Sequence, residues 1–281
     1  MAWTEITRLR YQRTGGRYAS DTTDAEWSLI EPEVPPPASV GRPRKNPLRD
    51  VVDAIFYIAQ TGCQWRMLPR CFPPFTTVQR YFYAWRRNGL WQRLNHVLLM
   101  ATREAEGRNP TPSAGIIDSQ SAKTTEAGGP RGYAAEKMVK GRKRHILTDT
   151  AGLLLAAIVH AANIQDRDGA VPLMGSLHGL YPWLKHLIFD AAYGGQKLSQ
   201  ALAKIGCWTT EVVRRPRGQK GFVTLPRRWV VERTLAWLNR NRRMSKNFEA
   251  TIESATVWLY IAHVKLLSRR LARHMEQAAT T

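Results

Sequence analysis

The chain has 281 residues and carries 42 lysines and arginines against 22 acidic residues, a formal net charge of +20. Hydrophobic residues make up 43% of it, which excludes a disordered polymer and allows one large core or two modest ones. A pI near 10.5 indicates a polyanionic partner, most simply nucleic acid; a basic surface without such a partner is the alternative.

The cysteines and the apolar segments indicate the compartment. Cys63, Cys71 and Cys207 are odd in number and form no CxxC motif, which favours a reducing environment. The chain shows no secretory signal, and no apolar run approaches the ~20 residues of a membrane span. We therefore expect a cytoplasmic protein without a membrane partner.

The first segments along the chain are basic and rich in proline. Residues 1–20 contain four arginines and little apolar periodicity, which predicts a flexible basic arm. Thr23 and Glu26 have the spacing of a capping box, so a short helix is expected to begin there and to stop at Pro32. Residues 32–47 predict a proline-rich basic linker.

Three further helices are predicted from apolar periodicity, the second of them capped by Thr76: Leu48–Thr61, Thr77–Gly89 and Leu90 to about Glu104. Residues 21–105 are therefore expected to form a helical DNA-binding domain. Residues 106–113 are polar and predict a linker to a second domain, residues 114–281.

The pattern changes at residue 114 to short apolar or alternating segments, which predict strands at 114–121, 144–149, 153–161, 186–190 and 209–215. Residues 149–152 supply a hairpin turn. Helices are expected at 166–178 and 196–205, around Glu232, and from Ser254 onward. This order predicts an α+β or mixed α/β fold, in which helices flank a mixed sheet.

Three acidic residues are the candidates for catalysis. Asp118 and Asp190 each follow an apolar strand-forming run, where open sheets place their ligands, whereas a single such aspartate is commonly a turn or cap residue. Glu232 is the one acid among seven bases between residues 227 and 246. Because carboxylates repel a polyanion, this combination indicates divalent cations between the acids and a phosphate.

Basic residues near aromatic ones or at strand and helix surfaces are the candidates for DNA contact. The segment 77–89 is predicted to enter a major groove, although its aromatic residues are equally suited to a core. Residues 41–45 suit either a minor groove or a solvated linker. The predicted contacts are Arg42, Arg44, Lys45, Arg80, Arg86, Arg87, Lys140, Arg142, Lys143, Arg228, Arg233, Asn239, Arg240 and Arg243.

Other polar residues are given structural roles. Asp166 and Asp168 are expected to cap the helix that follows them, with an indirect role near the site as the alternative, and His145 and His160 are expected to be core histidines. Ser119 and Tyr193 are expected to serve turn hydrogen bonding and packing rather than to act as nucleophiles.

Several segments also resemble a known family. RRWVVERTLAWLNRNRRMSKNFE (227–249) resembles the signature region of DDE transposases from bacterial insertion sequences, and IIDSQSAKT and LIFDAAYGG resemble their catalytic segments. The helical half resembles the DNA-binding domain that precedes them. The resemblance implies an RNase H-like fold in which Asp118, Asp190 and Glu232 hold two Mg²⁺ ions, with Mn²⁺ able to substitute.

The implied function is a transposase that binds the terminal inverted repeats of its element, cleaves there and joins the ends to target DNA. Its partners would be double-stranded DNA and at least one further copy of the chain, in a bacterial cytoplasm at the nucleoid. A catalytically inert DNA-binding protein derived from a transposase and a sequence-independent nuclease are the alternatives.

The sequence departs from one broader form of the family signature. That form has Tyr, two residues, Arg, three residues, Glu, six residues and Lys. The corresponding positions here are Leu225, Arg228, Glu232 and Asn239. The Arg and Glu match, and the Tyr and Lys do not, so the departure concerns the phosphate contacts near the site and not the carboxylates.

Overall fold

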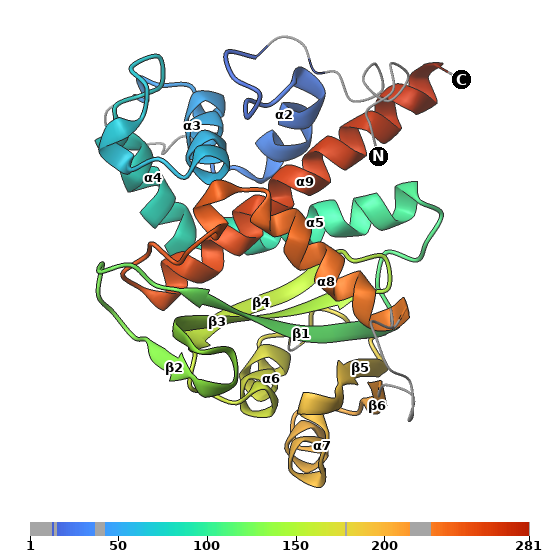
Figure 1. The fold of residues 1–281 in the computed structure, drawn as a ribbon. Coiled ribbons are helices and arrows are strands. Elements are labelled where there is room, and N and C mark those ends of the chain that lie inside the picture. Colours follow the sequence, from blue (N-terminus) through green and yellow to red (C-terminus); the bar gives the residue numbers. More distant parts are fainter. Residues whose placement is uncertain (1–12, 14–15, 37–42, 178, 214–225, 281) are drawn as a thin grey trace, which may run out of the picture.

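The structure is a computed structural model that describes residues 13, 16–36, 43–177, 179–213 and 226–280 (Figure 1). Its helical half comprises α2 (Asp24–Ile30), α3 (Leu48–Thr61), α4 (Phe75–Arg87) and α5 (Leu90–Ala105). Two short 3₁₀ helices, η1 (Glu31–Glu33) and η2 (Trp65–Met67), lie between them. The four helices predicted for this half are therefore confirmed.

Local chemistry explains most of their ends. The Thr23 hydroxyl accepts a hydrogen bond from the Glu26 amide, and the Glu26 carboxylate accepts one from the Thr23 amide, so the predicted capping box is present. Helix α3 ends before Gly62, which takes a left-handed φ of 71°. Helix α4 begins earlier than predicted, because Pro74 rather than Thr76 occupies the cap position and its carbonyl accepts the amide of Val78.

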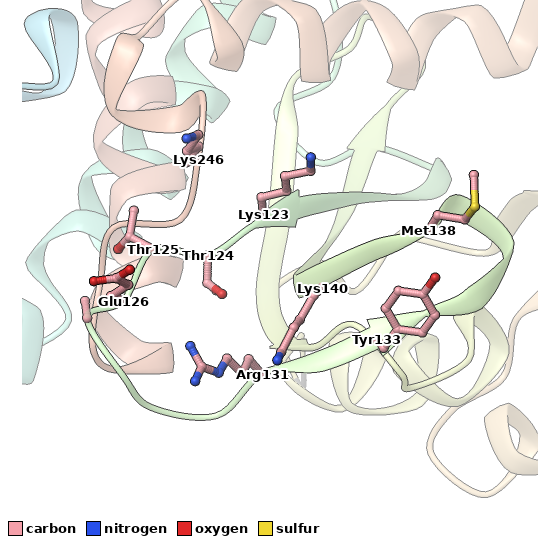
Figure 2. A pocket seen from close by; sticks show the side chains of 10 residues that line it. Lys123, Thr124, Thr125, Glu126, Arg131, Tyr133, Met138, Lys140 and Lys246 are labelled. Carbon is pink, nitrogen blue, oxygen red and sulfur yellow. The ribbon is translucent and has the colours of Figure 1, made fainter.

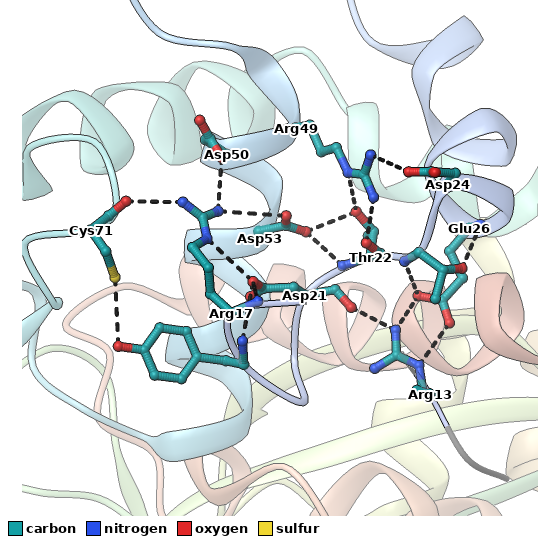
Figure 3. A network of polar contacts seen from close by, with 12 residues as sticks. Arg13, Arg17, Asp21, Thr22, Asp24, Glu26, Arg49, Asp50, Asp53 and Cys71 are labelled. Atoms are coloured by element: carbon teal, nitrogen blue, oxygen red, sulfur yellow. Dashed lines mark hydrogen bonds and ion pairs between the residues drawn. The ribbon is translucent and has the colours of Figure 1, made fainter. Parts of the chain in front are cut away.

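The described part of the N-terminal segment is anchored rather than free (Figure 3). Arg13 donates to the Glu26 carboxylate, and Arg17 donates to the carboxylates of Asp21 and Asp50. The prediction of a flexible arm over 1–20 therefore does not hold for Arg13 and residues 16–20. Its basis was the local density of arginine, and the acids that bind these arginines come partly from distant helices.

The sheet contains β1 (Ala114–Lys123), β2 (Gly132–Ala134), β3 (Val139–Asp149), β4 (Leu154–Ala161), β5 (His186–Asp190) and β6 (Thr209–Val213). Strand β3 pairs antiparallel with β1 on one edge and with β2 and then β4 on the other. Strands β1, β5 and β6 pair in parallel. This confirms the mixed sheet and the RNase H-like fold expected for the second half.

Strand β2 and the first residues of β3 were not predicted. They belong to a hairpin in which Gly132, Tyr133 and Ala134 pair with Gly141, Lys140 and Val139. The run from Lys140 to Arg144 does not read as a strand, because its charged residues hide the period of two.

The remaining helices are α6 (Asp166–Gly175), α7 (Gln196–Ala203), α8 (Pro226–Asn239) and α9 (Ile252–Thr280), with η3 (Ala135–Lys137), η4 (Ala191–Tyr193) and η5 (Arg242–Met244) between them. Helices α5, α8 and α9 lie on one face of the sheet, and α6 lies on the other (Figure 1). None of the described helices has the length and apolarity that a membrane span requires.

Helix α9 joins the two halves. It packs on α2, α3, α4 and α5 as well as on β4, and one hydrophobic core extends from the helical half into the sheet. At its centre His263 donates from Nδ1 to the Asn95 side chain on α5 and accepts at Nε2 from the Leu154 amide on β4. The two halves therefore pack on each other through α9, and residues 106–113 only connect them along the chain.

The buried His263 predicts a pH dependence of stability. Burial, with a smaller contribution from Arg270, lowers its pKa to about 3, whereas histidine in an unfolded chain titrates near 6.5. The unfolded chain therefore binds a proton that the folded protein does not, and stability falls as the pH drops below about 6.5. We expect His263→Gln to reduce the slope of unfolding free energy against pH by up to ~1.4 kcal/mol per unit between pH 6 and 5.

Urea denaturation at several pH values measures this slope. His274→Gln, near the end of the same helix, is the control for loss of one histidine. Equal slopes for His263→Gln and the unaltered protein would contradict the assignment.

Candidate active site

Asp118 and Asp190 lie on neighbouring parallel strands. Ile116 of β1 is the register partner of Ile188 of β5, and each aspartate lies two residues beyond its isoleucine. Asp118 accepts a hydrogen bond from the Ser119 amide at 2.7 Å, and Asp190 accepts one from the Ala192 amide at 2.9 Å. Both side chains are half-buried, so the sheet brings the two carboxylates to equivalent positions and local amides hold them.

Strand alternation places Asp118 on the face that α8 covers. Side chains two residues apart in a strand share a face, so Asp118 and Gln120 lie on one side of β1 and Ser119 on the other. Asn239 of α8 donates to Gln120 at 3.1 Å, which identifies that side. Glu232 precedes Asn239 by about two helical turns and is exposed. Asp118 and Glu232 therefore occupy the same side of the sheet.

The three acids do not form a closed metal site in this structure. Across the described ranges, no group of three or more His, Cys, Asp or Glu side chains is arranged to hold a metal ion. The donor chemistry nevertheless suits Mg²⁺, because two carboxylates on paired strands and a third on the covering helix supply the oxygen ligands that this ion prefers.

A buried polar cluster supports Asp118 from the opposite face of β1. The Ser119 hydroxyl donates to Asp166 at 2.8 Å, and Lys143 donates to the same carboxylate at 2.7 Å. Burial by itself raises the pKa of Asp166, but these two hydrogen bonds outweigh it and the pKa is lowered. Asp166 therefore does not cap α6, whose cap position holds Gln165, and this corrects the predicted role.

Tyr193 and His145 complete this cluster. Burial, and then the negative charges of Asp166, Asp118 and Asp190, raise the pKa of Tyr193 well above its ordinary value. The nitrogen Nδ1 of His145 lies 2.7 Å from Nε2 of His160, and burial lowers the pKa of His145 to about 3. The phenol and the imidazole are thus neutral near pH 7, and His145 lies in the core as predicted.

Three residues predicted to contact DNA are instead buried and bonded within the protein. Arg142 donates to the carbonyls of Pro130, Glu249 and Ala250, Lys143 binds Asp166, and Arg243 binds Glu249. Arg142 is fully buried, and the other two are 7% exposed. Their donors face internal acceptors. The prediction that Arg142, Lys143 and Arg243 contact DNA is therefore wrong for this structure.

Three more residues that were predicted to contact DNA form hydrogen bonds within the protein and are only partly exposed. Arg86 donates to the hydroxyl of Ser254 at 2.7 Å. Arg233 donates to the Ala151 carbonyl and lies over the rings of two tryptophans, and Asn239 bridges Gln120 and Arg144. These interactions fix α4 to α9 and α8 to the sheet.

The remaining predicted contacts are at the surface where the structure describes them. Arg44, Lys45 and Arg80 line one hollow of about 400 Å³ between the linker and α4. Arg87, Lys140 and Arg240 are exposed. Arg42 and the side chain of Arg228 lie outside the described residues.

Lys123 and Arg131 were not predicted to contact DNA, and Lys246 was noted only as one of the bases around Glu232. These residues line a second hollow together with Lys140 at the end of β1 (Figure 2). Their positions in the sequence are far apart, and only the hairpin of β2 and β3 and the chain before α9 bring them together. No local pattern marks them as a set.

Comparison with known proteins decides the family. Residues 109–265 match the model of a transposase DDE domain, which is more than half of the chain. The chain belongs to the DDE transposase family. Residues 22–95 of this transposase also match the model described as a putative transposase of the IS4/5 family, which places both halves in an insertion-sequence transposase.

Three relatives are similar over part of their length. A putative transposase for insertion sequence element IS402 from Burkholderia cepacia is 34% identical over 116 residues, covering 39% of this chain and 54% of the relative. An IS402 uncharacterized 16.2 kDa protein from the same organism is 34% identical over 114 residues, 37% of this chain and 74% of the relative. The uncharacterized protein y4sN of Sinorhizobium fredii is 30% identical over 83 residues, 30% of this chain and 64% of the relative. The chain thus spans about half the length of the IS402 transposase.

The burial of Arg142 gives a direct test of its role. Arg142→Met is expected to lower the free energy of unfolding by at least ~3 kcal/mol, because several buried acceptors lose a charged donor. Urea denaturation measures this loss, and Lys137→Met, at an exposed position of η3, is the control that removes one charge. An Arg142→Met protein of unchanged stability and weakened DNA binding would restore the original prediction.

Proposed function

We propose that this transposase binds the terminal inverted repeats of an insertion sequence, cleaves DNA at the element boundary and joins the ends to target DNA. Asp118, Asp190 and Glu232 are the catalytic carboxylates in this proposal. The observation that supports it is the parallel pairing of β1 with β5, in which Asp118 and Asp190 each follow a paired isoleucine by two residues, while α8, the helix that bears Glu232, bonds to Gln120 of β1. The family model spans all three positions.

The carboxylates would hold two Mg²⁺ ions, or Mn²⁺ in their place. When bound, these ions would activate the attacking hydroxyl and stabilise the leaving oxygen of the phosphodiester. The protein contributes a fixed strand pair for two of the ligands and a helix for the third. Glu232 is exposed, and it would supply the third carboxylate from the face of the sheet that α8 covers.

Neighbouring side chains would position the ligands rather than attack the DNA. The Ser119 hydroxyl donates to Asp166, and the raised pKa of Tyr193 keeps its phenol protonated. In this proposal Ser119 holds Asp166, and water or a DNA 3′-hydroxyl is the attacking group. Asp166 and Lys143 hold β1 from the side opposite the DNA.

Recognition of double-stranded DNA is assigned to the helical half. Arg80 and Arg87 are seven residues apart on α4, so they share its exposed face, while Val78, Phe82 and Trp85 form the buried face. Arg44 and Lys45 extend this basic surface. Joining two element ends requires two such surfaces, so a homodimer or larger assembly on DNA in the bacterial cytoplasm is part of the proposal.

The exposed side chain of Glu232 also suits the alternative of a catalytically inert DNA-binding protein. Cleavage of DNA that carries the element's own end separates the two. With Mg²⁺ we expect nicking at the boundary, and with EDTA or in Asp190→Asn a loss of about 10³-fold or more, because one of the carboxylates that hold the ions is removed. Boundary-specific binding by both proteins without cleavage by either would establish the inert alternative, and scattered cleavage would indicate a general nuclease.

A second experiment tests the recognition surface. Arg80→Ala/Arg87→Ala is expected to weaken binding to the element end by about 10-fold or more. It is also expected to reduce the slope of log binding constant against log salt concentration by the amount that corresponds to about two lost phosphate contacts. Arg86→Ala is the matched control on the same helix, because its guanidinium binds Thr251 and Ser254 inside the protein. Gel-shift titration at several salt concentrations measures both, and equal losses in the two proteins would contradict the assignment.

A further inference from the structure

A basic groove lies at the end of the sheet, where β1 leaves it (Figure 2). The groove has a volume of about 850 Å³. Its lining includes Lys123, Arg131, Tyr133, Met138, Lys140 and Lys246. These residues come from the end of β1, the loop to β2, the hairpin of β2 and β3, and the segment before α9.

The charges of the groove are available to a ligand. Its lining contains four cations, Lys123, Arg131, Lys140 and Lys246, and one carboxylate, Glu126. Among the described residues, none of the four cations forms an ion pair. Arg13 and Arg17, by contrast, form ion pairs with acids on α2 and α3. Four unneutralised cations around one hollow repel one another, which favours an anionic occupant.

Hydrogen bonds hold the segments around the groove. The amide of Asn247 donates to the Lys123 carbonyl at 2.8 Å, and the amide of Thr125 donates to the Asn247 carbonyl at 3.2 Å. Arg142 adds bonds to Pro130, next to Arg131, and to Glu249 and Ala250 in the segment after Lys246. The cations therefore project from loops that are already held in place, which reduces the entropy lost on binding.

The groove also offers an aromatic face. Tyr133 is 54% exposed and lies opposite Lys140 in the hairpin, and Met138 beside them is 78% exposed. An exposed aromatic ring among cations is the combination that binds single-stranded nucleic acid, since bases stack on the ring while phosphates meet the charges. A duplex keeps its base faces covered and would leave Tyr133 and Met138 without a partner.

The groove lies at the end of β1, the strand that carries Asp118. Lys123 is five residues beyond Asp118, about 17 Å along the strand, and this odd spacing puts it on the opposite face. Lys140 of β3 is four residues from Arg144, which donates to Asn239 on α8, so Lys140 shares the face that Asp118 occupies. A DNA strand that passes Asp118 on this face would therefore meet Lys140 at the groove.

We infer that the basic groove binds an unpaired stretch of DNA close to the cleavage position. Lys123, Arg131, Lys140 and Lys246 hold its phosphates, and a base stacks on Tyr133. This deepens the proposed function and rests on it only in taking DNA as the ligand. The groove is a binding site and contributes no group to the reaction.

Fluorescence anisotropy with a labelled oligo(dT) tests the inference, using full-length protein in EDTA so that no cleavage occurs. Tyr133→Ser is expected to weaken binding by about 5- to 100-fold with an unchanged salt dependence, and Tyr133→Phe to bind as the unaltered protein does. Lys140→Ala is expected to weaken binding and to reduce the slope of log binding constant against log salt concentration by about 0.7, the value for one phosphate contact on a single strand. Lys204→Ala, at the exposed end of α7, removes the same charge elsewhere and is expected to have no such effect.

The same proteins are then titrated with a blunt duplex of equal length, for which Tyr133→Ser is expected to bind as the unaltered protein does. Equal losses for Lys140→Ala and Lys204→Ala, or equal losses on duplex and oligo(dT) for Tyr133→Ser, would overturn the inference. Cross-linking of iododeoxyuridine in the oligo(dT) to Tyr133 would support it directly, and a cross-link confined to another part of the chain would oppose it. Because no cleavage is involved, a protein without transposase activity still gives a clear result for the groove.

Discussion

Strand β1 is hydrogen-bonded along both edges, antiparallel to β3 and parallel to β5. The parallel register brings Asp118 level with Asp190, and the antiparallel register brings Ser119 against His145 and the cluster around Asp166. A slip of one residue would turn Asp118 away from α8 and Ser119 toward it. The candidate site, its buried support and the approach to the basic groove therefore all depend on how this one strand is paired.

Much of the positive charge has an internal role. Arg142, Arg144 and Arg243 are buried and donate to backbone carbonyls, and burial lowers the pKa of Arg144 to about 10. Lys265 on α9 is buried and donates to Gln60 of α3, and burial with nearby arginines lowers its pKa to about 6. A net charge of +20 consequently overstates the surface that DNA can contact. The basic groove and the exposed side of α4 are two places where exposed cations gather.

The sequence was a good guide wherever a feature depends on neighbours along the chain. The capping box at Thr23, the α3 helix with Gly62 after it and the strand ending at Asp190 are all local patterns, and the structure confirms them. The assignment of Asp118, Asp190 and Glu232 to one site stays a prediction, because it depends on where α8 lies over the sheet.

Features that depend on distant partners were missed or misplaced. Arg142 and Arg243 lie in basic segments, which are typical of a DNA-binding surface. Only the fold reveals that carbonyls and a carboxylate from other segments surround them. The arginines before α2 find acids from beyond their own segment in the same way. The groove residues lie in four segments, so no window of the sequence contains them together.

Helix α9 has 29 residues and a length of about 43 Å, and it begins directly after the segment that forms one wall of the basic groove. Arg86 ties its first turn to α4, and farther along it packs against α2 and α5. The helix therefore joins the wall of the basic groove and helix α4 to the core that the two halves share.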